Sequence, residues 1–305
     1  MAWRKHTSSR QHILLYLAAA AILTYVAFVT LRAIYESAIF ARHDRVNVAF
    51  FGEEATILSF GLTDNVNYIV SLSHEQKIMI PGGYNQYPLG SLGKLVEIEK
   101  DPTILQRTFS SMTSSHINYF ISPKKPEVYE KPDTDEPTYR KRDFISHIFS
   151  SKYISNMSIF DKLYVSYLIG KRRQQDYVVL RSTVRRDEDD GARIFSEKSF
   201  LKKYKGFFYH QSLREEGMEV QIKYNTYKSA VTLSRVIEGQ GIRITDFSLT
   251  DRSDVKRCLI RTNEPKKTHT VQFLKRALAC DVEQGETEGV DIVLYLGKDI
   301  EALWE

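Results

Sequence analysis

Residues 220–224 read Val-Gln-Ile-Lys-Tyr, and this run opens the part of the chain that decides the fold. Its apolar and polar side chains alternate, which is the pattern of a strand with one buried face. Five further segments with strand or helix patterns follow. They are a helix over 231–238 that ends at Gly239, strands over 242–247 and 258–260, an amphipathic helix over 271–278, and a strand over 291–296 that Gly297 closes. The order β-α-β-β-α-β predicts a small α/β domain over 218–305, with its sheet covered on one face.

The preceding residues carry a second set of such patterns. The predicted elements are strands over 46–51, 67–72, 77–80 and 117–121, and helices that begin at Asp101-Pro102 and at Ser158. The second of these helices has Leu163, Tyr164, Tyr167 and Leu168 as its apolar side and ends at Gly170. Four of the eight prolines lie between 123 and 137, which predicts a solvated loop over 122–143. A mixed-sheet α/β domain over 46–208 is therefore expected before the tail domain.

A 19-residue stretch near the N-terminus, residues 13–31 (ILLYLAAAAILTYVAFVTL), has no charged side chain. A membrane-spanning helix needs about 20 such residues. The apolar region of a signal peptide is normally shorter, about 7–15 residues, and a buried helix of a soluble protein is rarely apolar on every face. The stretch therefore predicts a transmembrane helix over 13–35, preceded by a tail over 1–12.

Basic residues lie on both sides of this stretch and set the expected orientation. Arg4, Lys5 and Arg10 precede it without any acid, whereas the arginines after it are accompanied by acids. Acids contribute little to the positive-inside rule, so the bias is slight. Together with the shortness of the tail, it predicts an N-terminus in the cytoplasm and the bulk of the chain outside the cell membrane.

Composition narrows the kinds of binding and catalytic site that the chain can contain. The net charge of +5 is spread among 43 basic and 38 acidic residues, which speaks against a dedicated nucleic-acid-binding protein. The two cysteines, Cys258 and Cys280, exclude a Cys-rich zinc site. They can pair if the domain is exported, or remain as buried apolar residues in a reducing compartment. No Ser/His/Asp or Cys/His set is recognised, and His74 and His116 fall in loops expected to be solvated, so no catalytic residue, cofactor or metal site is predicted.

The tail resembles the C-terminal domain of the LytR–CpsA–Psr family, known as LytR_C. That domain opens with a strand and an Asn-Gly-Thr-like turn, continues with a helix and a second strand after a glycine, and closes with an Ala-Asp-Ile-Val-Val-type strand and Leu-Gly-Lys-Asp. Here the corresponding segments are residues 220–226, the helix around Leu233, residues 241–244 and residues 290–299 (VDIVLYLGKD). The resemblance implies a LytR_C-like domain over 218–305.

Residues 46–208 are similar in their element order to a distant LytR–CpsA–Psr (LCP) catalytic domain. Such domains attach polyprenyl-phosphate-linked glycopolymers to peptidoglycan, a phosphoryl transfer that needs arginines for the pyrophosphate and an acid for a divalent cation. Where the family has Arg-Thr-Asp-Thr, residues 62–65 read Leu-Thr-Asp-Asn. Where it has Ile-Pro-Arg-Asp, residues 80–83 read Ile-Pro-Gly-Gly. Asp64 alone remains, as a vestigial site residue or as an ordinary turn residue.

Three functions follow from these patterns. The first is a non-catalytic, membrane-anchored envelope protein that binds a wall polymer or another envelope protein, and it agrees with the missing arginines. The second is a divergent glycopolymer transferase with a relocated basic site, which requires two or more arginines to meet in one pocket. The third is a cytoplasmic regulator, which would need the reversed orientation and a DNA-reading helix that the sequence does not show. The expected partners are the lipid bilayer and an envelope component, and no nucleic acid.

Overall fold

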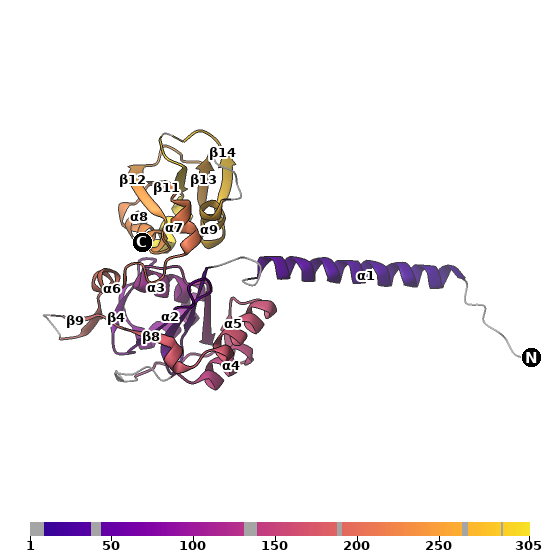
Figure 1. Cartoon of the computed structure of the whole chain (residues 1–305), viewed down its shortest axis with the longest axis horizontal. Coiled ribbons are helices and arrows are strands. Elements are labelled where there is room, and N and C mark those ends of the chain that lie inside the picture. The colour runs from indigo at the N-terminus through magenta and orange to yellow at the C-terminus, as the bar shows by residue number, and fades with distance from the viewer. Residues whose placement is uncertain (1–8, 38–43, 131–138, 188–190, 264–267, 288) are drawn as a thin grey trace, which may run out of the picture.

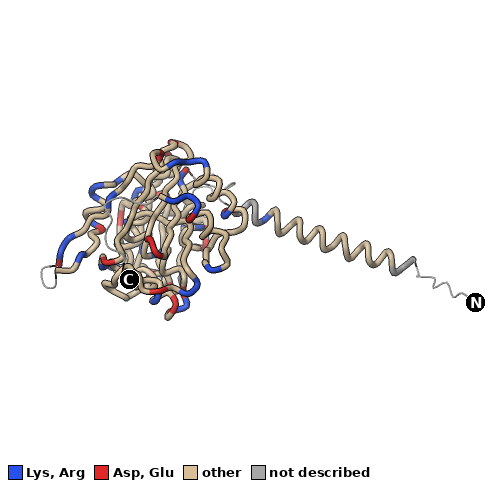
Figure 2. The backbone as a smooth tube through the Cα atoms, turned by 90° about the horizontal axis from the view of Figure 1, so that it is seen from below, with Lys and Arg blue, Asp and Glu red and all other residues tan. Residues whose placement is uncertain are grey.

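The computed structural model describes residues 9–37, 44–130, 139–187, 191–263, 268–287 and 289–305 (Figure 1). The predicted fold class is confirmed: an apolar N-terminal helix precedes a mixed α/β structure with three sheets. Helix α1 (Ser9–Glu36) projects away from the rest of the chain in both views (Figures 1 and 2). Within the described residues it is the one helix long and apolar enough to cross a membrane, over His12–Arg32.

Sheet A forms the centre of the N-terminal unit, which comprises residues 44–208. Its strands are β1 (Arg45–Phe50), β2 (Ala55–Gly61), β3 (Asn67–Leu72), β6 (Tyr119–Pro123), β7 (Tyr153–Ser155) and β8 (Tyr177–Arg181), in the order β7-β6-β1-β2-β3-β8. β1 runs antiparallel to β2 and parallel to β6. Every residue of β1 and β2 is buried, because both faces of the sheet are covered.

The two faces of sheet A carry different layers. One face packs on α4 (Lys141–Phe149) and α5 (Ile159–Lys171) through alternate residues of β1 such as Val48 and Phe50. The opposite face packs on helices α2 (Leu92–Glu99), α3 (Thr103–Thr113) and α6 (Glu197–Tyr204) and on sheet B. Sheet B contains β4 (Lys77–Ile80), β5 (Asn85–Pro88), β9 (Val184–Arg186) and β10 (Arg193–Phe195), and short 3-10 helices occur at Leu89–Ser91 and Gln174–Asp176.

Three details of the N-terminal unit differ from the sequence prediction. Helix α4 begins at Lys141, inside the predicted loop 122–143, of which residues 131–138 lie outside the described part. Helix α5 has the predicted N-cap at Ser158, but it continues through Gly170 to Lys171. His74 is buried rather than solvated, and in its buried position its Nε2 lies 2.9 Å from the carbonyl oxygen of Gly52.

The apolar side predicted for α5 is the most informative difference. Leu163 and Tyr167 were expected to face the core, yet their side chains are 54% and 59% exposed. The other two predicted residues do contact the core: Leu168 is buried and Tyr164 packs partly buried on the same cluster, together with Val165 and Ile169. The helix is apolar on two sides, and its periodicity does not distinguish them.

The C-terminal unit contains the six elements predicted for it, together with others. They are α7 (Gln211–Glu216), β11 (Glu219–Tyr224), α8 (Tyr227–Glu238), β12 (Arg243–Leu249), β13 (Cys258–Thr262), α9 (His269–Leu278), β14 (Asp281–Gln284), β15 (Ile292–Leu296) and α10 (Lys298–Trp304). The sheet order is β12-β11-β15-β13-β14. The core lies on one face of this sheet, where Ile222, Ile260 and Leu294 pack under the helices. A disulfide joins Cys258 and Cys280, whose Cα atoms are 4.8 Å apart.

The two units pack directly against each other through polar groups. The amide of Gln240 donates to Ser115 Oγ at 2.5 Å in a buried position, and Asp44 accepts hydrogen bonds from the backbone and hydroxyl of Ser212. The end of α8 lies so close to the end of α3 that a Cβ on Gly239 would come within 1.5 Å of the Ser114 carbonyl oxygen. Glycine at 239 therefore permits this close approach of two backbones.

Candidate functional site: the cleft between the units

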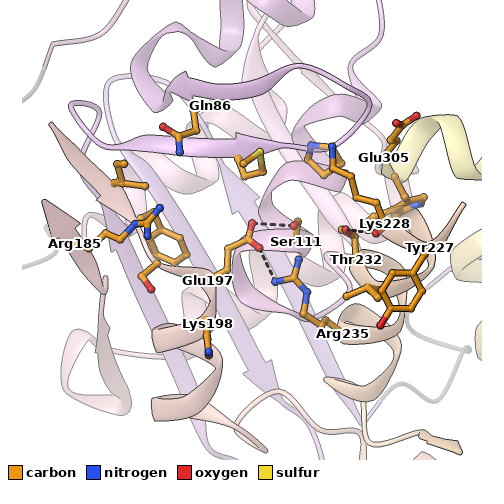
Figure 3. A pocket seen from close by; sticks show the side chains of 17 residues that line it. Gln86, Ser111, Arg185, Glu197, Lys198, Tyr227, Lys228, Thr232, Arg235 and Glu305 are labelled. Carbon is orange, nitrogen blue, oxygen red and sulfur yellow. Dashed lines mark hydrogen bonds and ion pairs between the residues drawn. The ribbon is translucent and has the colours of Figure 1, made fainter. Parts of the chain in front are cut away.

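A cleft of about 650 Å³ opens where the two units meet, and Figure 3 shows it from close by. This volume is typical of ligand-binding pockets. Its walls come from sheet B and α6 on one side and from α8 and α10 on the other. The side chains that line it include Met79, Ser111, Arg185, Phe195, Glu197, Lys198, Tyr227, Lys228, Arg235 and Glu305.

Glu197 occupies the centre of the cleft and is held from two sides. Its carboxylate accepts a hydrogen bond from Ser111 Oγ at 3.0 Å and forms an ion pair with Arg235 Nη1 at 2.9 Å (Figure 3). The Glu197 side chain is 12% exposed. Burial raises its pKa, although the charge of Arg235 and the hydrogen bonds from Ser111 and Arg235 oppose the rise. The pair joins α6 to α8 and so fixes one unit to the other across the cleft floor.

Three further cations surround this pair. Arg185 on β9 and Lys198 on α6 lie on one side of Glu197 in Figure 3, and Lys228 on α8 lies on the other. Among the residues that the structure describes, none of these three cations has a carboxylate partner within 4.0 Å. Four cationic side chains against Glu197 and Glu305 give the cleft lining a net charge of +2 (4 − 2). Such a cleft attracts anions.

The walls between these charges are apolar and partly aromatic. Met79, Phe195, Tyr227 and Val231 line the cleft, and the Tyr227 side chain is 62% exposed. An aromatic ring with one open face offers contact area without unpaired polar groups. Together, the cations and the rings suit an elongated ligand that alternates anionic groups with apolar or sugar-like surfaces.

The site residue expected from the sequence, Asp64, lies elsewhere and has a local role. Its carboxylate pairs with Arg45 at 2.7 Å and accepts a hydrogen bond from the Val66 backbone at 3.0 Å in the turn between β2 and β3. Arg45 is itself buried and stacks on Tyr68. These contacts are those of a residue that shapes a turn.

The positions that correspond to the family's charged residues do not converge. Leu62 packs with the cluster on the α4 and α5 face of sheet A. Gly82 has a positive φ of 98° and lies close to Leu303 of helix α10, beside the C-terminal unit. The structure therefore places these two positions in different surroundings, and they do not form a common pocket.

Residues 171–173 (Lys-Arg-Arg) form a basic run that is contiguous in the sequence. Arg172 of this cluster is buried at the end of α5, where it donates to the carbonyl oxygens of Leu168 and Gly61. It is a helix-terminal residue and lies outside the cleft. The cleft cations Arg185 and Lys228 are separated by 43 positions in sequence (228 − 185). Only the packing of one unit on the other brings them together, and no short motif carries that information.

A second cavity, of about 310 Å³, lies at the carboxyl ends of the parallel strands β1 and β6. Its rim carries three acids, Glu53, Glu54 and Asp143, beside Arg140 and His147. Burial lowers the pKa of His147, which favours its neutral form. The rim therefore has an acidic balance and is less suited to an anionic ligand than the cleft.

Comparisons with known proteins give structural neighbours only. No protein-family model matches the chain, and no curated protein matches it. Bacillus subtilis TagV is 6% identical with a TM-score of 0.36, over 53% of this chain and 97% of its own length. TagT bound to LI-WTA is 10% identical with a TM-score of 0.38, and the match covers 52% of this chain and 88% of the TagT chain.

A third neighbour is described as the LytR-CPS2A-psr family protein YwtF (TagT) with bound octaprenyl pyrophosphate lipid. It is 11% identical with a TM-score of 0.37, over 53% of this chain and 88% of its own length. This is the family that residues 46–208 resemble in their order of elements, and each match covers about half of the chain. The LytR_C assignment of residues 218–305 stays a prediction. Solved structures of LytR–CpsA–Psr proteins are thus among those to which this chain is similar, at low identity.

Proposed function

We propose that this chain is a membrane-anchored protein of the cell envelope that binds an anionic, phosphate-bearing glycan polymer in the cleft between its two units. Helix α1 is the anchor, residues 1–12 face the cytoplasm, and the remainder lies outside. Residues 46–208 act as an LCP-like domain and residues 218–305 as a LytR_C-like domain. That division is supported by hydrophobic cores that share no residue between the two units.

One observation carries the proposal: Arg185, Lys198 and Lys228 face one cleft without carboxylate partners among the described residues. Together with Arg235 they outnumber the two acids of the lining, Glu197 and Glu305, and they surround an apolar wall. A phosphate group can receive charge-assisted hydrogen bonds from such side chains. The exposed ring of Tyr227 offers a surface for the sugar units between successive phosphates.

Binding is testable with the full chain in detergent and a defined probe, poly(glycerol phosphate). Trp304 lines the cleft, so its fluorescence reports occupancy. Arg185→Gln and Lys228→Gln are each expected to weaken binding about tenfold, because each removes a charge-assisted contact of about 1.4 kcal/mol. Arg186→Gln is the matched control, since Arg186 is exposed on the same strand and does not line the cleft.

Uncharged dextran provides the control for the ligand and is expected to bind far more weakly than the phosphate polymer. Equal losses in Arg185→Gln and Arg186→Gln would show that any surface charge suffices. Such a result, or a lack of any binding, would contradict the proposal.

Glycopolymer transfer at the same cleft is a second function, favoured by the presence of two arginines, Arg185 and Arg235, in one lining. Phosphoryl transfer depends on such charges for positioning and neutralisation. Arg235 is already paired with Glu197, and Asp64 with Arg45, so we expect binding without turnover. The assay combines the full chain, a polyprenyl-pyrophosphate glycan, Mg²⁺ and peptidoglycan. Turnover that disappears in Arg185→Gln would establish the second function instead.

A further inference from the structure

Helix α5 presents an unusual outer surface. Ile159, Leu163 and Tyr167 lie four residues apart and form a ridge along its exposed side, here called the α5 ridge; their side chains are 57%, 54% and 59% exposed. The opposite side of the helix is buried on sheet A. A helix that is apolar on its solvent side as well as on its core side is typical of a helix with a second apolar partner.

The position of α5 in the fold identifies that partner. The chain enters the N-terminal unit at Asp44 and Arg45, eight to nine positions after the anchor helix ends at Glu36. Asp44 accepts a hydrogen bond from the Leu62 backbone, and Arg45 pairs with Gly61 in sheet A. Arg172, the C-cap of α5, reaches the carbonyl oxygen of the same Gly61 at 3.5 Å. The C-terminal end of α5 therefore lies at the point where the anchor joins the unit.

Covalent length limits how far this point lies from the membrane. Helix α1 ends at Glu36 and β1 begins at Arg45, so residues 37–44 connect them. A fully extended chain of this length covers at most about 30 Å. The α5 ridge extends only about 12 Å along the helix from Tyr167 to Ile159. The whole ridge thus stays within reach of the bilayer surface.

The charges at this end of α5 complement an anionic lipid surface. Lys171 lies on the helix beside the Tyr167 ring, at 6.0 Å, and Arg173 follows it. Lys141 of α4 donates to the carbonyl oxygen of Gly170 at 3.0 Å and adds a third cation. The acids of this region are Asp143 and Asp176 and, at the junction with the anchor, Asp44 and Asp64; Asp176 accepts a hydrogen bond from the Arg173 backbone and Asp64 is paired with Arg45. A Tyr beside a Lys at the end of an apolar ridge is typical of the membrane interface.

We propose that the α5 ridge lies in the interface of the same bilayer that holds α1, so that α5 is a second membrane contact and turns the cleft away from the lipid. The cleft is lined from sheet B and α6, which cover the opposite face of sheet A. Figure 1 shows α5 on the side of the unit toward α1, and α6 and β9 on the far side. The inference rests on the anchor of the proposed function and adds a specific lipid partner, a surface with anionic headgroups.

The test places one fluorescent nitrobenzoxadiazole label on the full chain in vesicles of phosphatidylcholine and phosphatidylglycerol. Cys258 and Cys280 are joined in a disulfide, so an added cysteine is labelled alone. Leu163→Cys reports the α5 ridge, and Leu249→Cys is the matched control, because Leu249 is also exposed, at 71%, on the C-terminal unit. Leu23→Cys within α1 reports the anchor.

Spin-labelled acyl chains are expected to quench the labels at 163 and 23 several-fold more than the label at 249. An unquenched label at 163 beside a quenched label at 23 would overturn the proposal. So would a blue-shifted but unquenched label at 163, which would indicate a protein partner. An unquenched label at 23 would refute the anchor and the α5 contact together. Polymer binding in detergent is measured separately, so a failed lipid contact is distinguishable from a failed cleft.

Discussion

Glu197 lies in the cleft between the two units and Glu283 lies on the outer face of the C-terminal sheet, and each carboxylate is paired with arginine. Glu197 has one arginine partner, Arg235 at 2.9 Å, and is 12% exposed. Glu283 has two, Arg252 at 2.9 Å and Arg261 at 2.6 Å, and is 35% exposed. Both arginines of the second group also lie over the ring of Tyr295.

The pKa values of these carboxyls move in opposite directions. Burial raises the pKa of Glu197, and Arg235 only partly opposes it. Desolvation also raises the pKa of Glu283, but the hydrogen bonds from Arg261 and Arg252 outweigh it, so the net pKa is lowered. The balance between removal from water and the hydrogen bonds from arginine thus decides the direction in which each pKa moves. Glu283 belongs to a half-buried network on the outer face of the sheet, whereas the more deeply buried carboxylate of Glu197 joins the two units through Arg235.

Forcing the two units apart is expected to destabilise the chain most. Gly239→Ala is expected to lower the free energy of unfolding by more than about 3 kcal/mol, because the added Cβ would meet the backbone oxygen of Ser114. Urea unfolding of the full chain in detergent measures the loss. Gly170→Ala is the control, since a Cβ at Gly170 in α5 meets nothing within 4 Å and alanine favours helices. Equal stability of the two variants would show that the units do not depend on this contact.

Breaking the buried pair is expected to have the next largest effect. Glu197→Ala leaves Arg235 partly buried without its partner, at a cost of about 2–3 kcal/mol. The double variant Glu197→Met/Arg235→Met removes both charges and is expected to recover most of this loss. A double variant as unstable as the single one would mean that lost packing, and not an unpaired charge, causes the effect.

The same pair has a defined dependence on pH. The pKa of Glu197 is raised in the folded chain, so between its unfolded value of about 4.3 and its folded value the native state holds more protons. Its contribution to stability is therefore present at low pH and is lost as the pH rises through the folded pKa. Unfolding of wild type and Glu197→Gln across this range is expected to show a difference that changes with pH in this direction. If the free energies of unfolding of wild type and Glu197→Gln changed in parallel with pH, the result would contradict the raised pKa of Glu197.

Much of the fold could be predicted from local patterns. The strand at 46–51 is a continuous apolar run, and β1 is buried on both faces. Ser158 and Asp161 form the capping box that begins α5, a signal contained in four residues. Such features depend on neighbours in the chain, which the sequence displays directly.

The cleft could not be predicted in this way. Glu197 and Arg235 meet because α3, α6 and α8 come together at Gly239, and no spacing along the chain encodes that contact. The apolar side predicted for α5 combines two sides of the helix, because the outward-facing Leu163 and Tyr167 fit the same helical period as Tyr164 and Leu168, which contact the core. Apolar side chains reveal a contact, but periodicity alone does not say whether the contact is a core or another surface.

The smallest effect on stability is expected at Glu283, on the outer face of the C-terminal sheet. There the network of Glu283, Arg252 and Arg261 contrasts with the Glu197–Arg235 pair of the cleft. Glu283→Gln is expected to lower the free energy of unfolding at neutral pH by less than about 1 kcal/mol, because exposed ion pairs gain little over their hydration. Since the pKa of Glu283 is lowered, its small contribution is present at neutral pH and is lost as the pH falls through the folded value, opposite to Glu197. High salt screens exposed charges, so the difference between wild type and Glu283→Gln should shrink there, while that for Glu197→Ala should persist. A salt-insensitive loss of several kcal/mol at Glu283 would show that Arg252, Arg261 and Tyr295 shield this carboxylate from water as effectively as the cleft shields Glu197.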